Sequence, residues 1–121
     1  MSMEEHSSGQ RTRRPDWAAL LIAVALVAGT GALIDFLHLH IDAAQGALLN
    51  PAGLTQHGVP LHDAIKAMPF PVIEVHISQV HKREAFRHHS YVSLRADGVM
   101  AGFGVEGYAL AVRRVCSLLA N

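Results

Sequence analysis

Two ionisable side chains stand two positions apart in an otherwise apolar run, Glu74 and His76 within Val72-Ile73-Glu74-Val75-His76-Ile77. A short run rich in β-branched residues predicts a buried strand, on which such a pair points to one face. His76 lies near the carboxyl end of this strand, where open α/β sheets place their ligands. A carboxylate that orients a histidine suits general acid or base chemistry. The alternative is a core histidine satisfied by its neighbour, with no chemical role.

The elements that position this pair alternate between helix and strand. Apolar periodicity predicts helices at 33–44, 60–67 and 105–119 and strands at 47–49, 72–77 and 99–103. In the first helix, Leu33, Phe36, Leu37 and His40 share one side. Such alternation implies an α/β fold whose parallel sheet is covered on both faces. We expect residues 1–15 to be a disordered polar tail and residues 16–121 to form a single domain.

Composition excludes some classes of function. Ten basic residues balance ten acidic ones, so there is no electrostatic case for binding nucleic acid. The single cysteine, Cys116, cannot form an internal disulfide, which fits a cytoplasmic setting. Because Cys116 follows the apolar pattern of the last helix, we expect it to be a small buried hydrophobe.

The segment from Trp17 to Ile34 contains no charged residue and follows several arginines. Its length raises the possibility of a membrane span or a signal sequence. However, Gly29-Thr30-Gly31 interrupts the run, which leaves about a dozen apolar residues before the first helix. A run of that length favours a helix or strand packed on the sheet, and we expect no membrane contact.

Two patterns resemble binding motifs without their context. Gly102-Phe103-Gly104-Val105-Glu106-Gly107 satisfies the dinucleotide fingerprint, but only fourteen residues follow it, too few for a second strand with its acidic ribose ligand. We expect these glycines to let a strand-to-helix turn pass close to its neighbours. The nine histidines include no spacing typical of a zinc site, so we expect no metal.

Three blocks of sequence carry a family resemblance in order and spacing. The first surrounds Asn50-Pro51-Ala52-Gly53-Leu54-Thr55, the second runs from Glu74 to Tyr91, and the third contains the glycines from Gly98 to Gly107. Together with Gly31 to His38, they resemble the type II 3-dehydroquinate dehydratases (type II dehydroquinases) over about residues 31–121. The resemblance implies a flavodoxin-like three-layer sandwich. It also implies the loss of water from 3-dehydroquinate to give 3-dehydroshikimate through an enolate, in the shikimate or quinate pathway. It implies no cofactor, and a homo-oligomer, the family's dodecamer.

The resemblance also assigns roles to individual residues. His76 matches the general acid that protonates the leaving hydroxyl, and Glu74 its orienting partner. The matches to substrate-binding positions are Asn50, Asp63 (across a subunit contact), the backbone amides of Ile77 and Ser78, and Arg87. For His81, Arg83 and Glu84 we expect structural roles.

The N-terminal part departs from the family's pattern. Residues 1–30 contain no Asn-Gly-Pro-Asn turn and no tyrosine, so the family's first strand, its lid and its tyrosine base have no counterpart there. Gln56 stands where the family has a substrate-binding histidine, and His57 follows one residue later. The N-terminus of the domain is thus truncated or altered. Two hypotheses remain, a working dehydratase with an unidentified base, or an impaired remnant that binds ligand or assembles without turnover.

Overall fold

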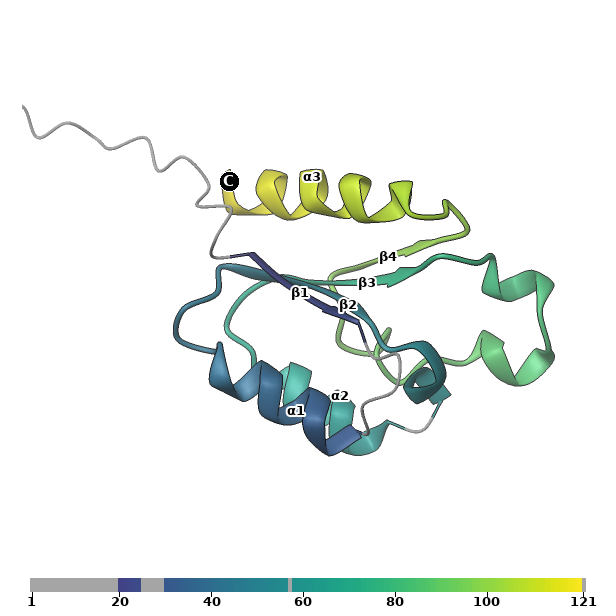
Figure 1. Ribbon diagram of the computed structural model, residues 1–121, viewed down its shortest axis with the longest axis horizontal. Helices are drawn as coiled ribbons and strands as arrows, with labels where there is room; N and C mark the ends of the chain where they lie inside the picture. The colour runs from purple at the N-terminus through teal and green to yellow at the C-terminus, as the bar shows by residue number, and fades with distance from the viewer. Residues whose placement is uncertain (1–19, 25–29, 57, 121) are drawn as a thin grey trace, which may run out of the picture.

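The computed structural model of the protein describes residues 20–24, 30–56 and 58–120 (Figure 1). The expected tail at residues 1–15, residues 17–19 and 25–29 of the uncharged segment, and His57 lie outside this range. The elements run β1 (Leu20–Val24), α1 (Thr30–Leu39), β2 (Gly46–Asn50), α2 (Val59–Lys66), β3 (Val72–His76), β4 (Gly98–Ala101) and α3 (Glu106–Ala120). The four strands form one parallel sheet in the order β1-β2-β3-β4.

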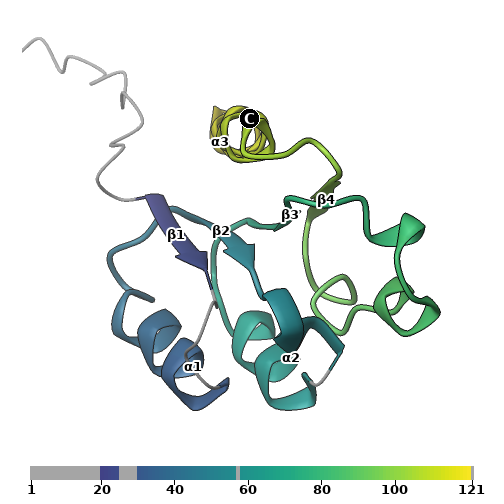
Figure 2. The same ribbon diagram turned by 45° about the vertical axis from the view of Figure 1, so that its right-hand side comes forward.

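The sheet is the middle of three layers. Helices α1 and α2 lie side by side on one face, and α3 covers the other (Figures 1 and 2). Strands β2 and β3 are buried along their whole length, and alternate side chains reach opposite layers. Ala47, Leu49 and Val72 join the core beneath α1 and α2, whereas Leu48 and Ile73 pack with residues of α3. This architecture confirms the predicted flavodoxin-like sandwich with its parallel sheet.

The uncharged N-terminal segment contributes a strand. Strand β1 pairs with β2 in parallel, with Leu20 opposite Gly46 and Val24 opposite Asn50. This agrees with the expectation of an element packed on the sheet and identifies it as β1. Within the described residues, no helix is long and apolar enough to cross a membrane.

Helix α1 ends five residues before the predicted boundary. The N–H groups of His40 and Ile41 donate to carbonyls only three residues back, at 3.2 and 3.3 Å, which tightens the last turn. The ring of His40 also donates from Nδ1 to the carbonyl of Phe36 at 2.8 Å. The predicted apolar side was partly wrong, because Leu33 and Leu37 are buried whereas Phe36 is 38 % exposed.

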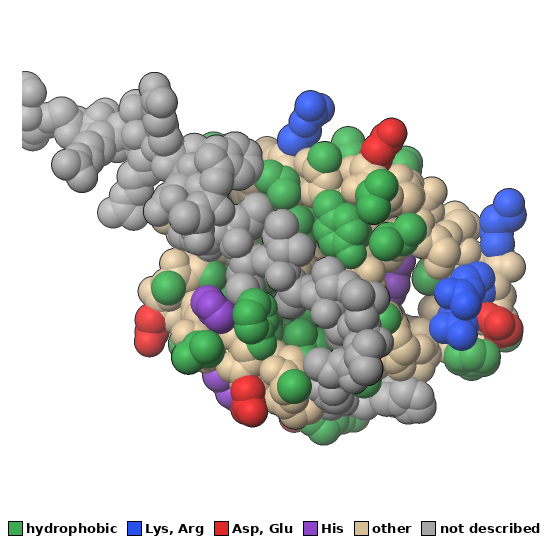
Figure 3. All heavy atoms as spheres, viewed as in Figure 1, with side chains coloured by type: hydrophobic (Ala, Val, Ile, Leu, Met, Phe, Trp, Pro, Cys, Tyr) green, Lys and Arg blue, Asp and Glu red, His purple; other side chains and the backbone are tan. Residues whose placement is uncertain are grey.

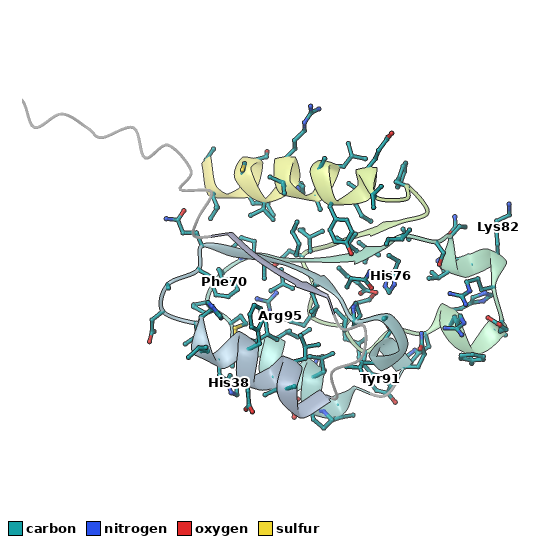
Figure 4. All side chains as sticks on the ribbon, in the orientation of Figure 1. His38, Phe70, His76, Lys82, Tyr91 and Arg95 are labelled. Atoms are coloured by element: carbon teal, nitrogen blue, oxygen red, sulfur yellow. The ribbon has the colours of Figure 1, made fainter. Side chains whose placement is uncertain are left out.

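Three short 3-10 helices were missed, and they carry the loops at one end of the sheet: η2 (Ala52–Gln56), η3 (Val80–Lys82) and η4 (Ala85–His88). A segment of three to five residues is too short to reveal a helical period in sequence. Figure 3 shows basic side chains gathered at the end of the molecule where Figure 4 labels Lys82. Helices η3 and η4 therefore present a positively charged lobe beside the sheet.

A clamp at the opposite end fixes the start of β3. The guanidinium of Arg95 donates to the carbonyls of Met68 and Phe70, both at 3.2 Å, and to the carboxylate of Asp97 at 3.0 Å. The same Asp97 oxygen accepts the backbone N–H of Val72 at 2.9 Å. These bonds tie the loop before β3 to the turn before β4, which sets where β3 enters the sheet.

Candidate active site

A cavity of about 320 Å³ opens at the carboxyl ends of β2 and β3, beside the η3–η4 lobe. It is lined by Asn50, Ala52, Gly53, Thr55, Gln56, His76, Ile77, Ser78, Val80, Arg83 and Arg87. Five of the seven residues singled out in the sequence are among them. They converge because parallel strands end at a common edge of the sheet, where the loops that follow them meet.

Glu74 and His76 are both buried, with 1 % and 8 % of their surfaces exposed, and His76 lines the cavity whereas Glu74 is not in the lining. Nε2–H of His76 donates to Oε2 of Glu74, because a carboxylate can only accept. Nδ1 of His76 has no hydrogen-bonding partner among the residues that the structure describes. Figure 4 shows His76 at the end of the sheet that faces the η3–η4 lobe. The ring is therefore anchored at one nitrogen and free to exchange a proton at the other.

Two serines, which the sequence analysis missed as site residues, also donate to Glu74. Oγ of Ser90 lies 3.1 and 3.0 Å from the two carboxylate oxygens, and Oγ of Ser93 lies 2.5 Å from Oε1. Burial acts to raise the pKa of Glu74. The hydrogen bond and charge of His76, with the hydrogen bonds of both serines, outweigh burial and leave this pKa below its ordinary value. Glu74 is thus held as an anion behind the histidine.

The amide of Asn50 is oriented by two bonds. Oδ1 accepts the backbone N–H of Ala52 at 3.1 Å, and Nδ2 donates to the hydroxyl of Tyr108 at 2.9 Å. Because the N–H of Ala52 can only donate, it determines which end of the amide is oxygen. A second Nδ2–H and a second lone pair on Oδ1 remain available to a ligand in the cavity.

The loop that follows Asn50 is held in a strained turn. Ala52 has φ 48°, the left-handed region that side chains other than glycine rarely adopt. Its carbonyl accepts the hydroxyl of Thr55 at 2.6 Å, and the carbonyl of Thr55 in turn accepts the N–H of Tyr91 at 3.1 Å. These bonds hold η2 against the cavity and place Gln56 in its lining.

The end of β3 offers backbone groups to the cavity. The N–H of Ser78 donates to no acceptor among the described residues. The carbonyls of His76 and Ile77 accept the N–H groups of Gly102 and Gly104, at 3.2 and 3.0 Å. Gly102 has φ 88°, and a Cβ there would lie 3.2 Å from Cβ of Gln79. Gly102 therefore allows the close approach expected from the sequence, whereas a Cβ at Gly104 would meet nothing within 4 Å.

Several residues considered in the sequence for binding, catalysis or metal coordination lie outside the cavity. Asp63 is on α2, where its side chain is 70 % exposed and accepts a hydrogen bond from His62 at 3.2 Å, so this chain does not bring it to the cavity. The rings of His81 and His88 pack against each other at a tilt of 52°, with their centroids 5.3 Å apart, and neither residue lines the cavity. No group of three possible metal ligands occurs in the described parts of the chain. Cys116 is half-buried rather than fully buried.

The charged side chains of the lining are cationic. Arg83 and Arg87 both line the cavity, and Nε–H of Arg87 donates to Oε2 of Glu84 at 2.7 Å. A backbone N–H and the two arginines lower the pKa of this exposed carboxyl. Arg83, for which a purely structural role was expected, thus reaches the cavity as well. A negatively charged ligand suits this wall.

The model of the family described as "Dehydroquinase class II" matches residues 11–116. The chain is 63 % identical to 3-dehydroquinate dehydratase of Cereibacter sphaeroides over 91 residues, covering 75 % of this chain and 62 % of that protein. It is 51 % identical over 89 residues to 3-dehydroquinate dehydratase 2 of Agrobacterium fabrum, covering 74 % and 60 %. The chain thus spans less than two thirds of the length of these curated relatives. Type II dehydroquinase from Propionibacterium acnes superposes with a TM-score of 0.69 at 35 % identity, covering 74 % of this chain and 65 % of that structure. The chain therefore belongs to the class II dehydroquinase family.

Proposed function

We propose that this chain acts as a 3-dehydroquinate dehydratase, converting 3-dehydroquinate to 3-dehydroshikimate and water. A base removes a proton beside the ketone to give an enolate, and Nδ1–H of His76 then protonates the departing hydroxyl. Hydroxide is a poor leaving group, so a positioned acid contributes about 100- to 10,000-fold. The observation that carries the proposal is that His76, which lines the cavity, is hydrogen-bonded to the buried carboxylate of Glu74.

The carboxylate at Nε2 suits the role of an acid. A doubly protonated ring carries a positive charge, and the anion of Glu74 stabilises that charge while keeping Nε2 protonated. The proton that moves is therefore the one on Nδ1. After transfer, the neutral ring remains anchored to Glu74 by the same hydrogen bond and is ready to be protonated again.

The rest of the lining supplies contacts of the right chemistry for a polyhydroxy carboxylate. We propose that the backbone N–H groups of Ile77 and Ser78 bind the substrate carboxylate, as amides at a strand end can. In this proposal Arg87 binds ring hydroxyls, and Asn50 contacts the substrate through the remaining donor and acceptor of its amide. Their convergence on one cavity supports these assignments.

A second candidate, ligand binding without turnover, is favoured because no base is found among the described residues of the cavity lining. Among the described residues that line the cavity, the ionisable side chains are His76, Arg83 and Arg87, and an arginine stays protonated and cannot accept a proton. Tyr91 and Tyr108 are not in the lining. Elimination requires one group to accept a proton and another to release one, so turnover requires a base from outside this set.

We further propose that the chain works as a homo-oligomer in the cytoplasm, in the shikimate or quinate pathway. The exposed carboxylate of Asp63 supports assembly, because a neighbouring copy can reach a side chain that is 70 % exposed. In the assembled protein, Asp63 would contact the cavity of that neighbour rather than its own. A single cysteine without a disulfide fits the reducing compartment.

Binding and turnover separate the two candidates when both are measured on the same preparation. A cyclic polyhydroxy acid that lacks the reactive ketone should raise the melting temperature, and near saturation each further tenfold excess adds about 1.4 kcal/mol of stability. With 3-dehydroquinate, a working enzyme forms a conjugated product whose ultraviolet absorbance grows with time. A thermal shift without product would establish a binding protein that does not turn over its ligand. The absence of both the thermal shift and the product would refute both candidates.

A further inference from the structure

The carboxylate of Glu74 accepts more hydrogen bonds than orientation of one ring requires. Besides Nε2–H of His76, it accepts hydroxyl groups from Ser90 and Ser93, which approach from the turn between η4 and β4. The single hydrogen of Ser90 is shared between both carboxylate oxygens, at 3.1 and 3.0 Å, while Ser93 faces Oε1 at 2.5 Å. Three side chains thus use the acceptor sites of one buried carboxylate.

The two serines also orient each other. The backbone N–H of Ser93 donates to Oγ of Ser90 at 3.1 Å, so that oxygen is occupied as an acceptor and its hydrogen is directed toward Glu74. The turn itself is anchored, because Val92 is fully buried in the core and its carbonyl accepts two N–H groups from residues 95 and 96. The hydroxyl groups are therefore held in place by the chain on either side of them.

We propose that Ser90 and Ser93 are positioning residues that keep Glu74 ionised and oriented behind His76, and thereby set the proton affinity of that histidine. This proposal rests on the proposed function, in which His76 is the general acid of the dehydration. The physical reason is competition for one negative charge. Hydroxyl groups that donate to the carboxylate of Glu74 reduce the negative charge that faces the ring of His76. They therefore favour the neutral ring beside the carboxylate over the imidazolium beside the carboxylate.

The other charged groups around His76 belong to residues that neither substitution alters. Arg83 and Arg87 line the same cavity from the η3–η4 lobe. Strand β2 contributes the neutral amide of Asn50, and α3 contributes the hydroxyl of Tyr108 that holds this amide. A change in the midpoint of His76 that follows removal of Ser90 or Ser93, and not the control substitution, is therefore assigned to the serine hydroxyl groups.

The test is a pH titration of the His76 ring by nuclear magnetic resonance in the free protein, with its signal assigned as the one missing from His76→Gln. Ser90→Ala and Ser93→Ala should each move the midpoint upward, by about half a pH unit, and the double variant should move it further. Ser93→Thr keeps a hydroxyl group at this position and should therefore have the midpoint of the wild type. Ser117→Ala, on the exposed face of α3, is the matched control and should leave the midpoint unchanged.

Unchanged midpoints in folded Ser90→Ala and Ser93→Ala would overturn the proposal and assign the serines to stability alone. If the double variant does not fold, the titration midpoints of the single variants and of Ser93→Thr still test the proposal. Because the titration uses no substrate, its result tests the role of the serines whether or not the protein turns over 3-dehydroquinate. Where turnover is measurable, the alkaline limb of its pH profile should move in the same direction as the titration midpoint.

Discussion

Asn50 at the end of β2 donates from Nδ2 to the hydroxyl of Tyr108 on α3, 2.9 Å away and 58 positions later in the chain. The bond crosses from the sheet to the helix that covers it, and it fixes an amide of the cavity wall by a residue that does not line the cavity. The position of α3 is thereby coupled to the geometry of the site.

Tyr108→Phe should weaken both the fold and ligand binding. The variant leaves a donor of a buried amide without its acceptor, at a cost of about 1 kcal/mol in the free energy of unfolding. The freed amide should also bind a cyclic polyhydroxy acid several-fold less tightly. Urea unfolding and a ligand titration measure the two effects. Tyr91→Phe is the control, since no hydrogen bond of the Tyr91 hydroxyl is found among the described residues; equal losses in the two variants would contradict the coupling.

Ala52→Gly should stabilise the protein. The left-handed conformation of Ala52, with φ 48°, costs roughly 1–2 kcal/mol for a residue with a Cβ, and glycine removes this cost while losing about 0.5–1 kcal/mol of backbone entropy. We expect a net gain of up to about 1 kcal/mol in urea unfolding with an unchanged slope. Ala67→Gly, in the ordinary helical region at φ −78°, should instead destabilise. A loss of stability in both variants would argue against strain at Ala52.

Glu74→Gln should flatten the dependence of stability on acid pH. The pKa of Glu74 is lower in the folded protein than its ordinary value of 4.5, so its contribution to stability is present above that value and is lost as the pH falls below it. The variant should be less stable by about 2 kcal/mol at pH 7, because hydrogen bonds to a charged group are lost. This difference should narrow on acidification. Chemical unfolding at several pH values measures it, and a difference that stayed constant or grew would contradict a lowered pKa.

Much of the fold follows from sequence periodicity alone. The strands β2 and β3 were recognisable as short apolar runs, and the spacing of Glu74 and His76 predicted a shared face because side chains alternate along every strand. The residues at which helices and strands end were harder to predict from the sequence. The last turn of α1 depends on hydrogen bonds at His40 and Ile41 that compete with continuation of the helix, and no periodic signal reports that competition.

The site was predictable where it lies on strands and not where it lies on turns. Ser90 and Ser93 reach Glu74 across 16 and 19 positions, and their approach depends on the path of the chain between η4 and β4. The bond from Asn50 to Tyr108 depends on how α3 crosses the sheet. Arg83 faces the cavity because η3 and η4 turn the chain there, and three-residue helices leave no period in the sequence.

The most direct test of acid catalysis by His76 follows the ultraviolet absorbance of the conjugated product during incubation with 3-dehydroquinate. We expect a measurable wild-type rate that falls at least about 100-fold in His76→Ala, because no other group in the described lining can protonate the leaving hydroxyl near neutral pH. His38→Ala, an exposed position on α1 outside the cavity, should retain the wild-type rate. Equal rates for the wild type and His76→Ala would contradict the assignment.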